Sequence, residues 1–500
     1  MRGAWRVADV RAAEEELMRR LPPDTLMHRA ATGLARRCAL LLSDRYGGVY
    51  GRRVLLLVGG GNNGGDALFA GAALARRGVR VHAWLLVPER VHAGGLAALR
   101  AAGGTLVDGF PSTVDVVVDG IVGIGGTGGL REPAATIVPR LSELRSSDGD
   151  RPTVVAVDLP SGVDIDTGHV PGVAVAADVT VTFGCLKPGL VVGPAVPYAG
   201  QVELVDIGLV PFLPADPAVR VPELADIRSW WPVPGPESDK YRRGVVGLAT
   251  GSARYPGAAL LSVAGALAGP AGMVRYAGAA APLISQRHPS VIVTERAGDA
   301  GRVQAWACGS GLGTDDLAAG QLRVVLAADV PAVLDADALT LIAEPMSRAF
   351  GERRAPTVIT PHDREFARLA GAPPGEDRVL AAQRLAAQMN VVVLLKGHAT
   401  IVATPSGVAW ANPTGTPALA TGGTGDVLTG LLGSLLAAGL SPEHAAVAAA
   451  YVHGLAGREA ARRGSVTAAD VAEVLPEVVG EVVAGGGSAL PASLGRRAVG

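Results

Sequence analysis

The first 210 residues alternate short β-branched runs with Ala-, Leu- and Arg-rich stretches of helical length. Strands are expected at residues 54–58, 79–86, 114–119, 153–158, 179–183 and 201–205. Helices are expected at 66–77 and 135–144, and an N-terminal helix near 7–20 precedes the first strand. Alternation of this kind predicts an α/β fold in which helices cover a parallel sheet.

A Pro-rich stretch from Pro211 to Glu237 interrupts the alternation and is the best domain boundary. Strands then follow at 245–249, 291–295, 332–334, 357–360, 391–396 and 401–403, with closing helices near 426–438, 442–462 and 468–482. The uncharged run 255–274 contains Pro256 and Pro270, so a buried helix–turn–strand is expected there. We predict domains at 1–212 and 237–483, a linker at 213–236 and a disordered tail at 484–500.

Composition narrows the class of protein. Hydrophobic residues make up 49% of the 500 residues and charged residues 18%, which describes a soluble globular chain. The net charge of −1 gives no reason to expect nucleic acid, and we expect no membrane partner. The three cysteines form no CxxC pair, which argues against a zinc site and fits a reducing compartment. A cytoplasmic location is therefore expected.

The first chemical centre follows the strand at 54–58, where the sequence reads GGGNNGGD from Gly59 to Asp66. Glycines let a backbone approach a phosphate closely, and the start of a helix supplies unpaired N–H groups. Gly59, Gly61 and Gly64 satisfy the GxGxxG pattern of dinucleotide-binding folds, but no convincing acid follows the next strand. Taken alone, the motif is equally consistent with a tight turn whose asparagines bond their own backbone.

Two further strand ends carry polar groups. One strand ends at Asp119 before a second Gly-rich loop, and another ends at Asp158 in the string DLPSGVD. Ligands bind outside the carboxyl ends of strands in open parallel sheets, so the three loops should converge on one crevice. A carboxylate such as Asp158 could shuttle a proton there.

Together with TFGCLKPG, these strings resemble the YjeF N-terminal domain, the NAD(P)H-hydrate epimerase, over nearly all of residues 1–210. The resemblance implies a Rossmann-like three-layer sandwich with Asp158 as the catalytic residue. It implies hydrate contacts from Asn62, Asn63, Gly64, Gly65, Asp66, Gly123, Ile124, Gly125, Gly126, Thr127, Gly128, Gly129 and Asp158. It also implies a potassium ion held by Asn63, Asp119 and Ser161, a donor set of oxygens that suits a hard cation. Gly60 and Ala67 depart from the usual GPGNNGGDG.

The second chemical centre is the string GGTGD at 422–426, which leads into an apolar helix. Its backbone N–H groups should form an anion hole at the helix N-terminus. Asp426 lies just beyond, where it could accept a proton from a hydroxyl. The alternative is an acid that only stabilises the helix dipole.

GGTGDVLTG and LKGHATIV resemble ribokinase-like kinases, and GSARYPGA, CGSGLG, LDADA, TPHDRE and YVHGLA together resemble the YjeF C-terminal domain, the ADP- or ATP-dependent NAD(P)H-hydrate dehydratase. This implies a ribokinase-like three-layer sandwich over about 237–480, with Mg²⁺ as a cofactor of the nucleotide. The hydrate-binding residues carried over are Ala258, Gly313, His362 and Asp426, with Asp426 catalytic. The nucleotide-binding ones are Lys396, Gly397, His398, Ala399, Thr400 and Gly425.

Two departures fall near the implied hydrate pocket. The family's TPHPGE reads TPHDRE here, so that Asp363 and Arg364 replace Pro-Gly. The usual AALRxGAG reads GALAGPAG at 265–272, which removes an arginine.

The combined hypothesis is a bifunctional enzyme that epimerises hydrated NADH and NADPH and dehydrates one epimer with ADP or ATP. A ribokinase-type vitamin or sugar kinase with a regulatory N-terminal domain is the alternative. A non-enzymatic binding role is a third, which Asp158 and Asp426 beside intact Gly loops disfavour. The choice between ADP and ATP, between NADH and NADPH, and between monomer and homo-oligomer is left open.

Overall fold

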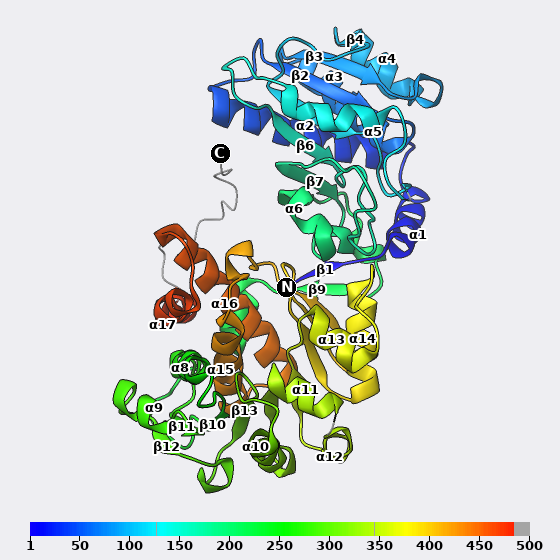
Figure 1. Cartoon of the computed structure of the whole chain (residues 1–500). Coiled ribbons are helices and arrows are strands. Elements are labelled where there is room, and N and C mark those ends of the chain that lie inside the picture. The colour runs from blue at the N-terminus through cyan, green and yellow to red at the C-terminus, as the bar shows by residue number, and fades with distance from the viewer. Residues whose placement is uncertain (127, 345, 485–500) are drawn as a thin grey trace. The chain divides into compact units, whose positions relative to one another are not determined.

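The structure is a computed structural model that describes residues 1–126, 128–344 and 346–484 (Figure 1). Of these, residues 3–218 form one compact unit, and residues 219–484 form a second together with Met1 and Arg2. The boundary therefore lies at 218/219. The predicted tail at 484–500 lies, beyond its first residue, outside the described residues.

The N-terminal unit is built on a seven-stranded sheet of order β4-β3-β2-β5-β6-β7-β8, in which every neighbouring pair is parallel. Its strands are β2 (Arg53–Val58), β3 (Arg80–Leu85), β4 (Thr105–Val107), β5 (Val116–Gly120), β6 (Thr153–Val157), β7 (Val179–Phe183) and β8 (Gln201–Val205). Its helices are α1 (Val7–Met18), α2 (Thr25–Tyr46), α3 (Asn62–Ala75), α4 (Ala93–Ala101), α5 (Ala134–Ile137) and α6 (Val196–Ala199).

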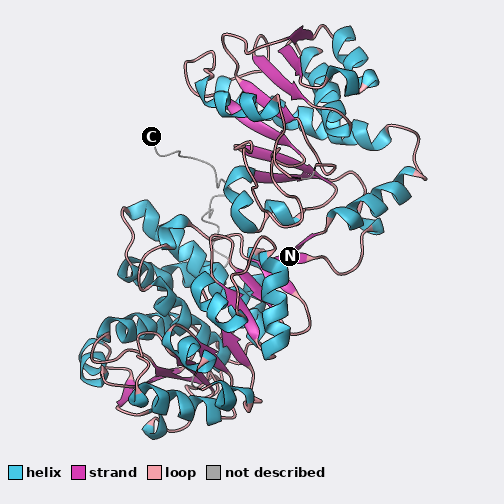
Figure 2. Ribbon diagram, turned by 45° about the vertical axis from the view of Figure 1, so that its right-hand side comes forward, coloured by secondary structure: helices cyan, strands magenta, loops and turns pink. Residues whose placement is uncertain are grey.

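Side-chain alternation along β2 creates the three layers of this unit. Val54, Leu56 and Val58 join the core formed with α1 to α4. Leu55 and Leu57 point to the opposite face and pack with α5 and the 3-10 helix Val138–Glu143. Both faces of the strand are buried because a parallel sheet carries its connecting helices on both sides. Figure 2 shows helices on either side of these strands.

The C-terminal unit contains an eleven-stranded sheet of order β1-β9-β18-β17-β16-β15-β14-β13-β10-β11-β12. The strands are β1 (Arg2–Ala4), β9 (Val219–Val221), β10 (Val245–Ala249), β11 (Met273–Ala277), β12 (Ile292–Thr294), β13 (Ala305–Cys308), β14 (Ala332–Leu334), β15 (Thr357–Ile359), β16 (Val392–Leu395), β17 (Ile401–Ala403) and β18 (Ala409–Ala411). Neighbours from β16 to β12 run parallel, whereas β17 is antiparallel to both β16 and β18.

Helices again lie on both faces of this sheet. One face packs on a core that includes α8 (Pro256–Ala268), α15 (Thr424–Ala437), α16 (Pro442–Arg463) and α17 (Ala468–Ala484). The other carries α10 (Asp316–Ala327), α11 (Asp337–Ala343), α13 (Asp363–Ala370) and α14 (Arg378–Met389), as Figure 1 shows. The run 255–274 folds as α8 and the start of β11, the expected helix–turn–strand. No helix among the described residues is long and apolar enough to cross a membrane.

Much of the predicted linker at 213–236 belongs to the C-terminal unit. Arg220 in β9 pairs with Trp410 of β18, and α7 (Leu224–Trp230) follows. The Trp230 ring stacks on His444 at 4.2 Å and meets Trp410 edge-on at 5.5 Å. The sequence signal fails here because β9 is only three residues long and prolines flank it, which conceals a strand pattern.

Two candidate active sites at the strand ends

The N-terminal site lies where the strand order reverses. From β2 the chain proceeds to β3 and β4 on one side and then returns to β5 on the other, which opens a crevice at the carboxyl ends of β2 and β5. The Gly59 N–H donates to the Gly120 carbonyl at 3.0 Å, which closes the gap between the two loops. Gly61 has φ +94° directly before α3, a conformation that a side chain would strain.

A cavity of about 530 Å³ occupies this crevice. Eight of the sequence-predicted hydrate residues line it, namely Asn62, Asn63, Asp66, Gly123, Ile124, Gly125, Gly126 and Asp158. Gly128 and Gly129 line an adjoining cavity of about 390 Å³ that also holds Arg90 and Arg131. Gly64 and Gly65 lie buried in the first turn of α3, and Thr127 lies outside the described residues. The three loops therefore converge as the sequence predicted.

Asp158 sits immediately after β6 with φ +66°, an uncommon backbone conformation for a non-glycine residue. Its Oδ1 accepts hydrogen bonds from Lys187 Nζ, from Thr182 Oγ1 at 3.0 Å and from the Phe183 N–H at 3.2 Å. Among the described residues, no hydrogen bond reaches its Oδ2 from the protein. One carboxylate oxygen is thus fixed, while the second is left for a ligand.

Asp66 lines the same cavity and is buried, yet its Oδ1 has no hydrogen-bond partner among the described residues. Burial raises the pKa of this carboxyl well above its usual range, and the nearby charges of Asp158 and Glu14 raise it further. Burial also raises the pKa of Glu14, although Lys187 opposes that shift. The cavity therefore favours a protonated Asp66 beside Asp158.

Of the three residues predicted to hold potassium, Asp119 and Ser161 are hydrogen-bonded to each other. Asp119 is fully buried; its Oδ1 accepts from Ser161 Oγ at 2.6 Å and its Oδ2 from the Ser161 N–H at 2.8 Å. Burial raises the pKa of Asp119 to about 6 against these hydrogen bonds. The Asn63 side chain packs against Gly123, and its Nδ2 is buried without a partner among the described residues.

Four charged residues at this site escaped the sequence analysis. Arg11 and Glu14 of α1, and Arg90 after β3, line the cavity of about 530 Å³. Lys187 lies in the TFGCLKPG string that carried the resemblance, but its burial could not be foreseen. Arg11 also donates to the Ile124 carbonyl at 2.9 Å, so that α1 helps to position the second Gly-rich loop.

The C-terminal site lies at an equivalent reversal of strand order, between β10 and β13. The Gly251 N–H donates to the Ser310 carbonyl at 2.7 Å, which joins the loops that follow the two strands. Ala258 packs against Gly311, and the Gly313 N–H donates to Asp337 Oδ2 at 2.8 Å. The predicted hydrate position Ala258, in the first turn of α8, thus contacts the loop after β13 that contains the other position, Gly313.

A fully buried carboxylate organises the centre of this site. Asp335 accepts from Lys396 Nζ at 2.7 Å, Thr360 Oγ1 at 2.8 Å and Thr429 Oγ1 at 3.0 Å. Burial opposes its charge, but Lys396 and the hydroxyl donors lower the pKa of Asp335 overall. The pair therefore keeps both charges, and the ammonium of Lys396 is fixed beside the start of α15.

Asp426 occupies the first turn of α15, three residues after Gly423, which precedes the helix at φ +92°. Burial raises its pKa to about 7, and the negative charge of Asp335 adds to the shift. A Cβ built at Gly425 would lie 3.7 Å from both Lys396 Nζ and Asp335 Oδ2. Asp426, Gly425 and Lys396 are therefore neighbours, a base candidate beside an anion hole and a cation.

The loop between β16 and β17 contains the predicted nucleotide residues Lys396, Gly397, His398, Ala399 and Thr400. Thr400 Oγ1 donates to the Gly397 carbonyl at 3.1 Å, and Ala399 is buried. The backbone of His398 lies so close to Gly415 that a Cβ there would overlap its carbonyl oxygen. The loop thus has a defined conformation.

His362 has a structural function that its motif did not reveal. Its Nδ1 accepts from the N–H groups of Arg364 and Glu365 at 3.1 and 3.4 Å, and so caps α13. Glu365 returns the bond by accepting from the His362 N–H at 2.8 Å. The Asp363 that replaces the family's proline forms a two-bond ion pair with Arg378, which also donates to the Lys396 carbonyl.

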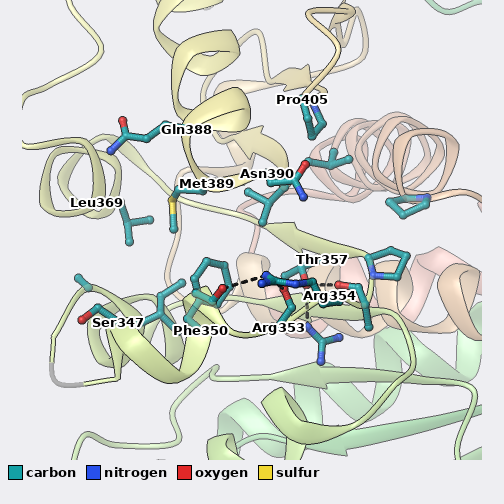
Figure 3. Close-up of a pocket in the computed structure, with 18 of the residues that line it drawn as sticks. Ser347, Phe350, Arg353, Arg354, Thr357, Leu369, Gln388, Met389, Asn390 and Pro405 are labelled. Carbon is teal, nitrogen blue, oxygen red and sulfur yellow. Dashed lines mark hydrogen bonds between the residues drawn. The ribbon is translucent and has the colours of Figure 1, made fainter.

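A separate cavity of about 710 Å³ lies at the opposite end of the same sheet (Figure 3). It contains Thr357 and Val392, the first residues of β15 and β16, and none of the predicted site residues. The guanidinium of Arg353 in this cavity already donates hydrogen bonds to the backbone carbonyls of Val325, Leu326, Ala328 and Val330. We assign it no chemistry because parallel sheets bind their ligands at the carboxyl ends of strands.

Each unit therefore presents a carboxylate beside a Gly-rich loop at a helix start, the arrangement of an enzyme with two nucleotide sites. Residues 23–189 match the family described as YjeF-related protein N-terminus, and residues 246–477 match NAD(P)H-hydrate dehydratase. The chain is 48% identical over 470 residues to the bifunctional NAD(P)H-hydrate repair enzyme Nnr of Mycobacterium leprae, covering 94% of this chain and 95% of the relative.

Other relatives carry the same name. The Mycobacterium tuberculosis protein is 48% identical and covers 89% of this chain and 91% of its own length. That of Salinibacter ruber is 36% identical, over 96% and 95%. The chain belongs to the family of bifunctional NAD(P)H-hydrate repair enzymes, which confirms the predicted family and two-domain α/β class. Among solved structures, ADP/ATP-dependent NAD(P)H-hydrate dehydratase from Bacillus subtilis, co-crystallised with ATP/Mg²⁺, is 33% identical with a TM-score of 0.49, covering 53% of this chain and 99% of its own.

Proposed function

We propose that the N-terminal unit interconverts the R and S forms of hydrated NADH and NADPH, and that the C-terminal unit dehydrates the S form at the expense of ADP or ATP. The observation that carries this proposal is the placement of Asp158 and Asp426, each at a carboxyl strand end or helix start beside Gly-rich loops, in a chain of this family. Three buried free cysteines are compatible with a reducing compartment, and we propose a cytoplasmic enzyme.

In the epimerase site, the hydrated nicotinamide lies against Asp158, whose Oδ1 is fixed by Lys187 and whose Oδ2 faces the ligand. The hydrate carries its hydroxyl on the carbon next to the ring nitrogen, so inversion requires one bond at that carbon to break and re-form. Asp158 moves the proton that this exchange requires. Asn62, Asn63, Asp66 and the 123–129 loop hold the dinucleotide.

Potassium is proposed for the pocket of Asp119, Ser161 and Asn63. A desolvated carboxylate, a hydroxyl and an amide oxygen match the ligand preferences of a hard monovalent cation. The chain's own contribution is to fix these oxygens beside the 121–123 loop, since the Val122 N–H donates to Ser161 Oγ at 3.0 Å. Potassium should therefore raise the melting temperature relative to choline, and Asp119→Asn should remove that difference.

In the dehydratase site, the hydroxyl of the S hydrate attacks the terminal phosphorus of the nucleotide while Asp426 accepts the hydroxyl proton. The bond from phosphorus to the leaving nucleotide breaks, and the new phosphate ester is then eliminated as phosphate with loss of a proton from the adjacent carbon. The amides at 422–425 and the ammonium of Lys396 stabilise the transferring charge. Mg²⁺ bound with the nucleotide phosphates would neutralise the remainder.

Racemic hydrate with ADP or ATP and Mg²⁺, followed by the return of reduced-nicotinamide absorbance, tests the proposal. The wild type should recover all of the hydrate, whereas Asp158→Asn should stop at the S half. Asp426→Asn should recover none and still bind ADP in a calorimeter. Release of a phosphorylated acceptor in place of phosphate and NAD(P)H would identify a ribokinase-type kinase instead.

A further inference from the structure

The mechanism described above assigns Asp66 to dinucleotide binding and gives its carboxyl no part in proton transfer. Asp66 lines the cavity together with Asp158, is 8% exposed, and presents a buried Oδ1 that no described residue donates to or accepts from. A buried polar atom without a hydrogen-bond partner destabilises the folded protein. Such a cost is tolerated where a ligand supplies the missing partner.

The two carboxyls differ in their surroundings. Asp158 is held by a buried ammonium, a hydroxyl and an N–H, all of which stabilise its anion. Asp66 lies inside α3 without a cationic partner among its described contacts. Neighbouring carboxyls whose environments push their protonation apart are the usual arrangement of an acid and a base.

We propose that Asp66 is a second catalytic residue of the epimerase, the general acid that works opposite the base Asp158, with one proton shared between them. This inference rests on the proposed epimerase function and extends it to a second group. Asp66 also lies where two cavities adjoin, which supports the proposal. Asp66, Asn62, Glu14 and Phe183 line both the cavity of about 530 Å³ and an adjoining, more apolar one of about 280 Å³.

The proton balance follows directly. Asp66 gives its proton to the departing hydroxyl, the carbon–oxygen bond breaks, and the ring nitrogen's electron pair forms the iminium, releasing water. A water then adds to the opposite face of that carbon and gives a proton to Asp158. The new hydroxyl has inverted configuration, and a proton returns from Asp158 to Asp66 through solvent. In the reverse direction the two groups exchange roles.

The protonation of Asp66 agrees with this assignment. Burial raises its pKa well above its usual range, and the charges of Asp158 and Glu14 raise it further, which favours the acid form. The charged and titratable groups around this end of the crevice are Arg11 and Glu14 from α1, Asp24 before α2, Asp158 after β6, Lys187 after β7, Arg90 after β3 and His92 at the start of α4. Lys187 is already bound to Asp158 and does not neutralise Asp66.

Asp66→Asn is the decisive variant, because asparagine has nearly the shape and the neutral charge of the protonated acid. A residue that only binds the hydrate would lose little by this change. A general acid should lose about 10²- to 10⁴-fold in the epimerisation rate constant, with hydrate affinity nearly unchanged. The dehydration rate of purified S hydrate by the same full-length chain reports that the protein is folded.

Two further measurements complete the test. Wild-type epimerisation should decline at alkaline pH as Asp66 loses its proton, and Asp66→Glu should retain part of the rate and of that decline. At neutral pH, the infrared difference spectrum of wild type minus Asp66→Asn should contain one protonated-carboxyl band, because the other protonated carboxyls of the chain, such as Asp426, contribute equally to both spectra. Epimerisation by Asp66→Asn within a few-fold of wild type overturns the role of Asp66. A wild-type chain that does not epimerise overturns the proposed function itself.

Discussion

Among single residues, Lys187 stands out as a buried ammonium bound to the catalytic carboxylate Asp158. Its Nζ donates to Asp158, to Thr182 Oγ1 at 2.9 Å and to the Phe183 carbonyl at 3.0 Å, and the residue is 1% exposed. Removing one partner of a buried ion pair leaves an uncompensated charge, which costs about 3–5 kcal/mol. Lys187→Met should lower the unfolding free energy by that amount and slow epimerisation.

Denaturant titration of the full chain measures this loss in the transition of the N-terminal unit. Arg151→Met is the matched control, since it breaks the Arg151–Asp178 pair of the same unit, whose side chains are 50% and 35% exposed. Exposed pairs contribute about 0–1 kcal/mol, so this control should change little. If both variants lose the same unfolding free energy, the buried pair of Lys187 and Asp158 stabilises the unit no more than an exposed pair does.

Asp426 gives a prediction about pH. Burial raises its pKa to about 7, with Asp335 adding to the shift, and only the deprotonated form can accept the hydroxyl proton. The kcat/KM of dehydration should therefore rise with pH through about 7 and level off above it, because this ratio reports the free enzyme. Stopped-flow recovery of S hydrate between acidic and mildly alkaline pH measures the profile. A flat profile would exclude Asp426 as the titrating base.

The candidate catalytic residues could be located from the sequence, whereas several of their neighbours could not. Asp158 and Asp426 follow strand ends or Gly-rich turns within motifs, so their positions could be predicted. In the structure Asp158 lines the N-terminal cavity, and Asp426 lies in the first turn of α15. Glu14 and Arg11 lie on a helix far upstream, and only the tertiary fold carries α1 to the cavity. His362 was predicted to bind hydrate; its role in capping α13 became visible only with the backbone in place. Its hydrate contact stays a prediction.

At the scale of elements, the helices α8 and α15 cross in close contact near the dehydratase site. Gly265 in α8 faces the backbone of Val427, and Gly430 in α15 faces that of Ser262; a Cβ at either glycine would overlap a carbonyl oxygen. This explains one part of the GALAGPAG departure, since Gly265 serves a close helix contact. Asp426 precedes Val427, so the crossing also positions the base.

Gly265→Ala should therefore separate α8 from α15. Overpacking a tight contact costs about 1–3 kcal/mol, and dehydration should fall together with stability because Asp426 moves. Thermal unfolding and the dehydration assay measure both effects. Gly320→Ala is the control, since a Cβ there meets nothing within 4 Å in the helix α10 and should stabilise by about 0.5–1 kcal/mol. Gly265→Ala with wild-type stability would contradict this account of the crossing.

The helix α2 and the strand β13, which the sequence did not predict, share a physical cause. The 22-residue helix α2 buries mostly alanines, such as Ala30, Ala31 and Ala35, so it lacks a strong apolar stripe. The strand β13 reads AWAC and was overlooked for the same lack of β-branched residues. Segments with strong patterns, such as β2 and α15, were predicted close to their observed bounds. Packing, not local propensity, determines the weakly patterned segments.

At the scale of the whole molecule, each unit has its own sheet and its own hydrophobic core. The sequence predicted two α/β domains, and the strand order within each sheet came only from the structure. The position of β9 decides where the units divide, because it supplies an edge strand to the sheet of the C-terminal unit. A boundary read from the prolines alone would cut through that sheet.

The division at 218/219 predicts which fragments of the chain fold and retain activity. A fragment of residues 3–218 should epimerise without nucleotide, and one of 219–484 should dehydrate only the S form. A fragment of 230–484 loses β9 and most of α7, including the fully buried Ile227, and exposes the edge of β18. Loss of a buried isoleucine alone costs about 2–5 kcal/mol, so this fragment should melt well below 219–484 or aggregate through its open edge. Circular dichroism melting and light scattering of the two fragments measure the difference. If the fragments 219–484 and 230–484 are equally stable, β9 and α7 do not stabilise the C-terminal unit. If the fragments 3–218 and 219–484 are folded but inactive, the two activities require the intact chain.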